Sequence, residues 1–185
     1  LTMNTFYFLR HGETIKDPSR PAIEWQLTTE TEFILTKLAE NPQFVKITQI
    51  YTSSEDKAIR TALPFTEKLK IPSVVVPGLE EVHRGTTFLT DDEFIKLKRL
   101  KFEDMEANPD GGESSYAALS RFTQAIEHIN TSHKNEHILV ISHGTVLALY
   151  FAHLKKDYAK LFEYWSMIPF CGVAVVNNKS VIKDF

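Results

Sequence analysis

The stretch Val140-Ile141-Ser142-His143-Gly144 ends an apolar run that begins at Ile138. A short run of this kind is typical of a strand that is buried on both faces of a parallel sheet. The same arrangement occurs near the N-terminus, in Phe8-Leu9-Arg10-His11-Gly12. Each histidine therefore follows a predicted strand and precedes a glycine turn. Because ligands of open α/β sheets bind outside the carboxyl ends of the strands, we expect His11 and His143 to meet in one pocket.

Short β-rich runs alternate along the chain with longer segments of helical period. The β-rich runs cover residues 6–9, 47–51, 74–76, 138–141, 173–176 and 181–182. The helical patterns cover residues 33–39, 54–69, 94–100, 113–130 and 145–154. Ser54 is expected to cap the second helix. This alternation predicts a single α/β domain over residues 1–185, a three-layer α/β/α sandwich with a mainly parallel sheet.

The composition is that of a folded globular protein and excludes several classes of function. The 185 residues are 43% hydrophobic and 24% charged, with a net charge of -3, so no overall basic field favours nucleic acid. No apolar stretch is long enough to predict a membrane span or a secretory signal, which makes the cytoplasm the expected location. The single cysteine, Cys171, can form neither an intrachain disulfide nor a cysteine zinc cluster.

The residues at the two strand ends favour anion chemistry. The chain contains no His-Glu-x-x-His zinc motif, no Gly-x-Ser-x-Gly elbow and no glycine-rich phosphate loop. Arg10 can form a bidentate contact with an anion, and a neutral imidazole can accept a phosphoryl group as a nucleophile. The alternative is that each histidine only satisfies a carbonyl group in its turn.

Five motifs, taken in order, resemble the histidine phosphatase superfamily, which includes the cofactor-dependent phosphoglycerate mutases. The first is Leu9-Arg10-His11-Gly12-Glu13-Thr14 and the last is Ser142-His143-Gly144. The motifs between them are Thr52-Ser53 with Ala58-Ile59-Arg60-Thr61-Ala62, Leu79-Glu80-Glu81 with Gly85, and Gly112-Glu113-Ser114. The resemblance implies a phosphoglycerate mutase-like fold.

The resemblance also implies a role for each site residue. His11 would attack phosphorus and become phosphohistidine, while Arg10 and His143 would bind the equatorial oxygens. Glu81 would protonate the leaving oxygen and then activate water, for which we expect a raised pKa. Thr14 and Gly144, from the two histidine motifs, are candidate substrate-binding residues, and Arg84 is a third. No metal and no cofactor is implied.

The chain departs from the family pattern at three positions. Lys57 stands where the family has a phosphate-binding Arg, two positions after the Leu of Thr-Ser-x-Leu-x-Arg-Ala, and Arg60 follows three residues later. Asp17 stands where Asn is common, and Thr31 where Gly is usual. We expect the Lys57 ammonium to bind phosphate. Arg60 is the alternative ligand, and in a third interpretation both cations are merely solvated.

The predicted function is a phosphatase that hydrolyses a small phosphomonoester. A phosphoglycerate mutase-type phosphoryl transferase is the first alternative; such proteins are generally longer, and here only an insertion at about 86–110 is a candidate lid. The second alternative is a non-catalytic phosphate-binding relative. The sequence predicts neither the substrate nor the oligomeric state.

Overall fold

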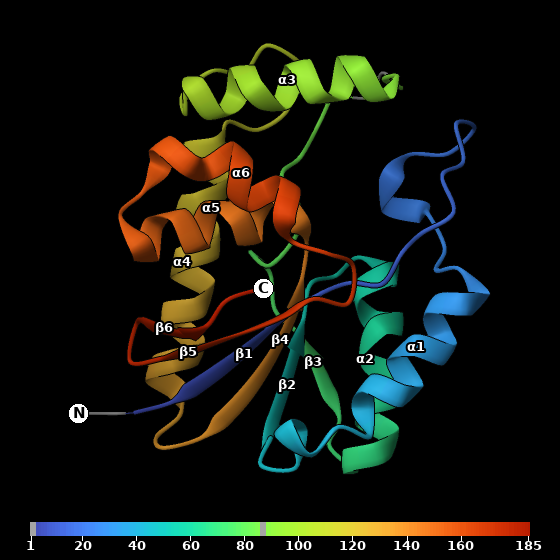
Figure 1. The fold of residues 1–185 in the computed structure, drawn as a ribbon, viewed down its shortest axis with the longest axis vertical. Coiled ribbons are helices and arrows are strands. Elements are labelled where there is room, and N and C mark those ends of the chain that lie inside the picture. The colour runs from blue at the N-terminus through green and yellow to red at the C-terminus, as the bar shows by residue number, and fades with distance from the viewer. Residues whose placement is uncertain (1–2, 86–87) are drawn as a thin grey trace.

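Strands β1 (Thr5–Arg10) and β4 (His137–Ser142) lie side by side at the centre of the sheet (Figure 1). The computed structural model describes residues 3–85 and 88–185. The two strands pair in parallel, with Arg10 opposite Ser142. His11 and His143 therefore leave the sheet from the same edge, as the sequence predicts.

The sheet has the order β3-β2-β4-β1-β5-β6 within the described residues. Strands β2 (Gln49–Thr52) and β3 (Ser73–Val75) extend the parallel part beyond β4. Strands β5 (Val173–Asn177) and β6 (Ser180–Lys183) run antiparallel and close the other side. The prediction of a mainly parallel sheet, ended by a hairpin, is confirmed.

Helices cover both faces of the sheet, which gives the three predicted layers (Figure 1). On one face lie α1 (Thr29–Ala39) and α2 (Asp56–Leu69), and on the other lie α4 (Ser115–Ser132) and α5 (Gly144–Lys155). Successive residues of β1 supply the two cores, because side chains alternate along a strand. Phe8 packs in the core beneath α4 and α5, and Leu9 packs in the core beneath α1 and α2.

Two further helices lie beyond the carboxyl ends of the parallel strands. Helix α3 (Asp91–Glu103) crosses the top of the view in Figure 1, and α6 (Leu161–Met167) lies beneath it. A capping box between Thr90 and Glu93 fixes the start of α3. Phe102 of α3 packs edge-on against Trp165 of α6, at 6.2 Å between ring centroids. The region proposed as a lid, 86–110, thus contains α3, while its residues 86 and 87 lie outside the described chain.

The prediction that Ser54 caps the second helix is wrong. Helix α2 begins at Asp56 with Glu55 as the N-cap residue, and the Glu55 side chain makes no capping bond within the described chain. The Ser54 hydroxyl instead donates to Glu80 at 3.1 Å. The Glu55 carboxylate points away from its own helix end, and its partners are described below.

Residues 3–85 and 88–185 also contain three short 3-10 helices: η1 (Ala22–Glu24), η2 (Pro42–Phe44) and η3 (Tyr158–Lys160). Of the helices described, none has both the length and the apolar character needed to cross a membrane.

Candidate active site

His11 has the tautomer and the charge that a nucleophilic imidazole needs. Its Nδ1 donates to the carbonyl oxygen of Gly12 at 2.7 Å, which leaves the lone pair on Nε2. Burial, followed by the neighbouring His143 and Lys57, holds the pKa of His11 well below its usual value. The ring is therefore neutral at physiological pH.

His143 lies beside His11, with 5.0 Å between the ring centroids. Its Nε2 is 2.7 Å from the Ser53 hydroxyl oxygen at the end of β2. Its Nδ1 is buried and has no hydrogen-bond partner among residues 3–85 and 88–185. Burial lowers the pKa of His143 to about 3, so this ring is also neutral. The two predicted histidines thus meet in one site, and one of them keeps an unused polar atom there.

The Arg10 guanidinium lies across the N-terminus of α5. Its Nη1 donates to the carbonyl oxygen of Ile168 at 2.5 Å, and its Cζ sits 3.9 Å above the ring of Phe170. Its Nε is buried and unpartnered among the described residues. A Cβ at Gly144 would lie 3.0 Å from the Arg10 Cζ and Nε, so glycine makes room for this side chain. Gly144 therefore positions Arg10.

The Glu81 carboxylate is held by backbone amides. Its Oε1 accepts from Val82 and Val146, at 2.9 and 3.0 Å, and its Oε2 accepts from Thr145 at 2.9 Å. Two of these donors belong to the first turn of α5, where the helix dipole favours an anion. Burial by itself would raise the pKa of Glu81, but the Lys98 ammonium, His143 and these amides lower it well below its usual value. The prediction of a raised pKa for Glu81 is wrong.

Arg121 of α4 holds the loop that carries Glu81. Its Nη1 donates to the carbonyl oxygens of Gly78 and Glu80, both at 2.9 Å, and its Nη2 donates to that of Glu81 at 2.8 Å. Glu113 fixes the guanidinium through Nε and Nη2, at 2.7 and 2.8 Å. The sequence analysis noted the Gly112-Glu113-Ser114 motif but missed Arg121, eight residues further on.

Lys57 lies in the site, but it does not stand free. Its Nζ is 2.8 Å from the Glu55 Oε2 and donates to the carbonyl oxygen of Ala22, also at 2.8 Å. The two side chains are only 7% and 5% exposed. Sequence reasoning missed Glu55, although an acid two residues before the unusual lysine was a usable signal.

Lys98 is a second residue that the sequence analysis missed. It comes from α3, is 2% exposed, and donates to the Thr145 hydroxyl at 2.8 Å. Its positive charge lowers the pKa of Glu81, so α3, the helix of the predicted lid region, contributes a cation to the site. Its position on the apolar stripe of a lysine-rich helix gave no signal of this role.

The remaining candidate residues have partners outside the group of side chains described above. The Arg60 guanidinium is exposed and pairs with Asp56 at 2.6 Å on the surface of α2. Arg84 stacks over the ring of Phe94 at 4.9 Å and lines a cavity of about 390 Å³ below α3. Thr14 is half-buried and forms an isolated β-bridge with Leu27.

A family model describes this combination of motifs and fold. The model of the histidine phosphatase superfamily (branch 1) matches residues 6–180. The chain belongs to this superfamily.

Two curated relatives come from Arabidopsis thaliana. Phosphoglycerate mutase-like protein 4 is 28% identical over 151 residues, which cover 75% of this chain and 66% of the relative. A metal-independent phosphoserine phosphatase is 32% identical over 107 residues, which cover 53% of this chain and 44% of the relative. The chain thus spans less than two thirds of the length of either relative.

Solved structures of other proteins share the fold. Bacillus stearothermophilus YhfR superposes with a TM-score of 0.77 at 26% identity, covering 97% of this chain and 95% of its own. A mycobacterial glucosyl-3-phosphoglycerate phosphatase gives a TM-score of 0.78 at 19% identity, covering 95% and 90% of the two chains. A phosphoserine phosphatase from Entamoeba histolytica, solved with phosphoserine, gives 0.74 at 19% identity and covers 96% of each chain. At 19% identity these last two likenesses show the fold alone.

The other two departures from the histidine phosphatase pattern have local explanations. Asp17 accepts from the backbone amide and the hydroxyl of Ser19, at 2.9 and 2.6 Å, so its carboxylate is used within its own turn. The Thr31 Cγ2 fills the space where a Cβ on Gly12 would lie, at only 2.0 Å from it. Thr31 is therefore accommodated because residue 12 has no side chain.

Cys171 lies near Arg10 at the same edge of the sheet. Burial raises the pKa of its thiol to about 11, so the thiolate that a nucleophile requires is scarce at neutral pH. Among the described residues, no three or more His, Cys, Asp or Glu form a group that could hold a metal ion.

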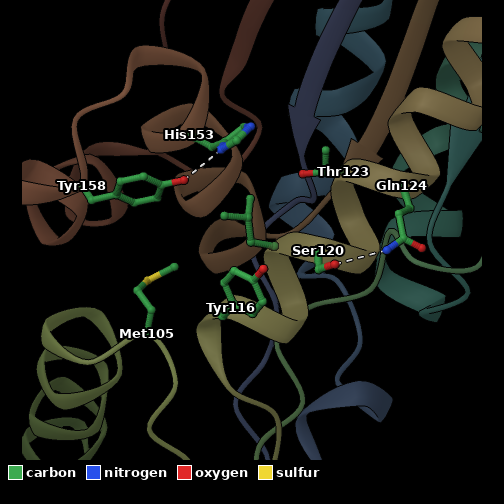
Figure 2. Close-up of a pocket in the computed structure, with 8 residues that line it drawn as sticks. Met105, Tyr116, Ser120, Thr123, Gln124, His153 and Tyr158 are labelled. Carbon is green, nitrogen blue, oxygen red and sulfur yellow. Dashed lines mark hydrogen bonds between the residues drawn. The ribbon is translucent and has the colours of Figure 1, made fainter.

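A cavity of about 480 Å³ lies on the outer side of α4 (Figure 2). Ser120, Thr123 and Gln124 project from α4 on one side, and His153 faces Tyr158 across the other, with 2.8 Å between Nδ1 and the hydroxyl oxygen. None of the predicted site residues lines it.

Proposed function

We propose that this histidine phosphatase hydrolyses a small phosphomonoester through a phosphohistidine on His11. The observation that carries the proposal is the state of that ring: its Nδ1 proton is engaged by Gly12, and its Nε2 lone pair is free beside Arg10 and His143. A neutral imidazole with a fixed tautomer is a competent nucleophile. The relatives that are phosphatases by name support hydrolysis of a phosphomonoester.

In the first step, the His11 Nε2 attacks phosphorus. A P–N bond forms, the P–O bond to the leaving group breaks, and its electron pair stays on the leaving oxygen. That oxygen takes up a proton that the phosphomonoester brings in and Glu81 relays. Arg10 and His143 supply donors to the phosphoryl oxygens, where charge is held in the transition state. The unpartnered Arg10 Nε and His143 Nδ1 give these residues unused polar atoms for that purpose.

In the second step, water attacks the phosphohistidine. A P–O bond forms, the P–N bond breaks, and Glu81 takes the proton that the water loses. Its low pKa keeps it ionised, which suits the role of base. Arg121 keeps the carboxylate in place through the loop carbonyl groups, so it acts as a positioning residue.

The test is to trap the intermediate. Rapid quench with a ³²P-labelled phosphomonoester should give an acid-labile, base-stable protein adduct that is absent in His11→Ala. His128→Ala is the matched control, because His128 is an exposed histidine on α4 and should leave the adduct unchanged. Turnover of 4-nitrophenyl phosphate by the same samples measures hydrolysis. Label that persists in His11→Ala would refute the assignment, and binding of phosphate with no turnover would favour a non-catalytic relative.

A further inference from the structure

Glu55 places a negative charge where this site is expected to bind an anion. Its Oε2 contacts the Lys57 Nζ at 2.8 Å, and its Oε1 lies 3.4 Å from the His143 Nε2. The same Oε1 accepts from the backbone amide of Glu81 at 2.9 Å. One carboxylate, 5% exposed, therefore touches three segments of the site.

The position of Glu55 in the chain explains how it reaches them. It precedes the first turn of α2, and its side chain leaves the helix end uncapped among the described residues. It turns instead toward the carboxyl edge of the sheet, where β2 and β4 end. A buried carboxylate against a buried ammonium costs desolvation energy and adds little net stability. The pair is thus better explained by function than by stability of the fold.

The charged groups around His11 sum to one positive charge. Arg10, Lys57 and Lys98 are cations, Glu55 and Glu81 are anions, and the rings of His11 and His143 are neutral. Ser53 is the remaining polar group against Glu55, and its hydroxyl oxygen accepts from the Glu55 amide at 3.3 Å. Lys98 lies beyond Glu81, against Thr145. A monoanionic phosphate would therefore neutralise these groups, whereas a dianionic phosphate would leave one negative charge over.

We propose that Glu55 is a specificity-determining residue that makes the site select the monoanion of a phosphomonoester, because its carboxylate occupies the Lys57 ammonium. This inference rests on the proposed phosphatase function and deepens it. Phosphomonoesters lose their second proton at about pH 6, so the monoanion and the dianion are both present in the cell. The one net positive charge of the site offsets a monoanion but not a dianion.

The monoanion also supplies the proton that the leaving oxygen needs in the first chemical step. Glu81 is ionised and has no proton of its own to give. The proton on the monoanionic phosphate can pass to Glu81 and from there to the leaving oxygen, which departs as a neutral alcohol. A dianion brings no such proton. Selection of the monoanion and the ionised state of Glu81 are therefore consistent with each other.

The test compares variants that change the charge of the site one unit at a time. Calorimetry measures their binding of inorganic phosphate at about pH 5.5 and about pH 8, because phosphate loses a proton between these two pH values. Lys57→Met makes the site more negative, Glu55→Gln makes it more positive, and the double variant Glu55→Gln/Lys57→Met restores the original balance. At about pH 8, Glu55→Gln should bind phosphate about 10- to 100-fold more tightly than the wild type, and Lys57→Met more weakly by a similar factor. The double variant should return to within about threefold of the wild type.

The pH dependence and a matched control complete the test. Wild-type affinity should weaken from about pH 5.5 to about pH 8, and Glu55→Gln should lose most of that change. Asp56→Asn removes the same charge one residue away, on the exposed side of α2, and should leave the affinity unchanged. In turnover, Glu55→Gln should lower KM above about pH 7 without raising kcat, because product phosphate leaves more slowly.

Two results would overturn the role of Glu55. One is a folded Glu55→Gln protein with unchanged or weaker phosphate affinity at about pH 8, and the other is an Asp56→Asn variant that gains as much affinity as Glu55→Gln. If Glu55→Gln does not fold, the phosphate affinities of Lys57→Met and the double variant are compared instead. Equal affinities in these two variants would also overturn the role of Glu55. These outcomes are separate from the proposed function, which fails only if no phosphohistidine forms on His11.

Discussion

Replacement of Lys98 by methionine should stabilise the fold at neutral pH. The ammonium is 2% exposed, and in the described chain its one hydrogen-bond partner is the Thr145 hydroxyl. No carboxylate of the described residues lies within ion-pair distance of it, although Glu81 is near enough to attract it. A buried charge with so few partners costs more in lost hydration than it recovers. Methionine keeps the length of the side chain and removes the charge.

The expected size of the effect follows from the pKa of Lys98. Burial lowers this pKa from 10.5 to about 8. The unfolded chain therefore binds the proton more tightly than the folded chain, and the difference corresponds to about 3 kcal/mol of lost stability. The loss is complete below about pH 8 and disappears as the pH rises toward 10.5. Lys98→Met should raise the melting temperature by about 5 to 10 °C at neutral pH and by much less near pH 10.5.

Thermal and urea unfolding at the two pH values measure this effect, with Lys101→Met as the control. Lys101 is on the same helix and is equally buried, but it has a carboxylate partner in Asp110, at 2.8 Å. Its replacement should destabilise the protein by about 3 to 5 kcal/mol, because it leaves Asp110 unpaired. A Lys98→Met protein that is no more stable than the wild type at neutral pH would refute the reasoning.

Lys98→Met should also be less active, which would explain why the chain keeps a lysine that lowers its stability. The Lys98 ammonium lowers the pKa of Glu81, so its removal should raise that pKa. The acidic limb of the pH profile of kcat/KM should then move to higher pH, whereas Lys101→Met should leave the limb in place. A gain in stability without a change in the profile would mean that Lys98 does not act on Glu81.

Three further predictions concern groups around the site. Arg121→Ala releases the three carbonyl groups of the Glu81 loop and should lower kcat/KM at least about tenfold. Urea unfolding should show a free energy of unfolding lower by about 1 to 3 kcal/mol. Full activity would show that the loop keeps its conformation without Arg121. Gly144→Ala brings a methyl group to 3.0 Å from the Arg10 guanidinium and should weaken competitive inhibition by vanadate about tenfold, while circular dichroism shows an intact fold. Activity should survive EDTA, since no step above uses a metal; loss of turnover that a divalent ion restores would contradict this expectation.

The site could be predicted only where it rests on local signals. His11, His143 and Arg10 follow short apolar runs, and the ends of parallel strands converge on one edge of the sheet. The alternation of strands and helices predicted the layers for the same reason, because each element carries its own period. Helix α6 escaped prediction because it has only seven residues and buries only Leu161. The start of α2 was misplaced because Ser54 finds a partner 26 residues away, in Glu80.

The tertiary structure decided the charges of the site. The pKa of Glu81 depends on amides from Thr145 and Val146 and on Lys98 from α3, which are far from it in the chain. Lys57 was predicted as a phosphate ligand, which stays a prediction, and burial beside Glu55 makes its ammonium one half of an ion pair. Strand periods and strand ends are set by neighbours along the chain and can be identified from the sequence. Ionisation depends on burial and on distances between groups that only the folded chain brings together.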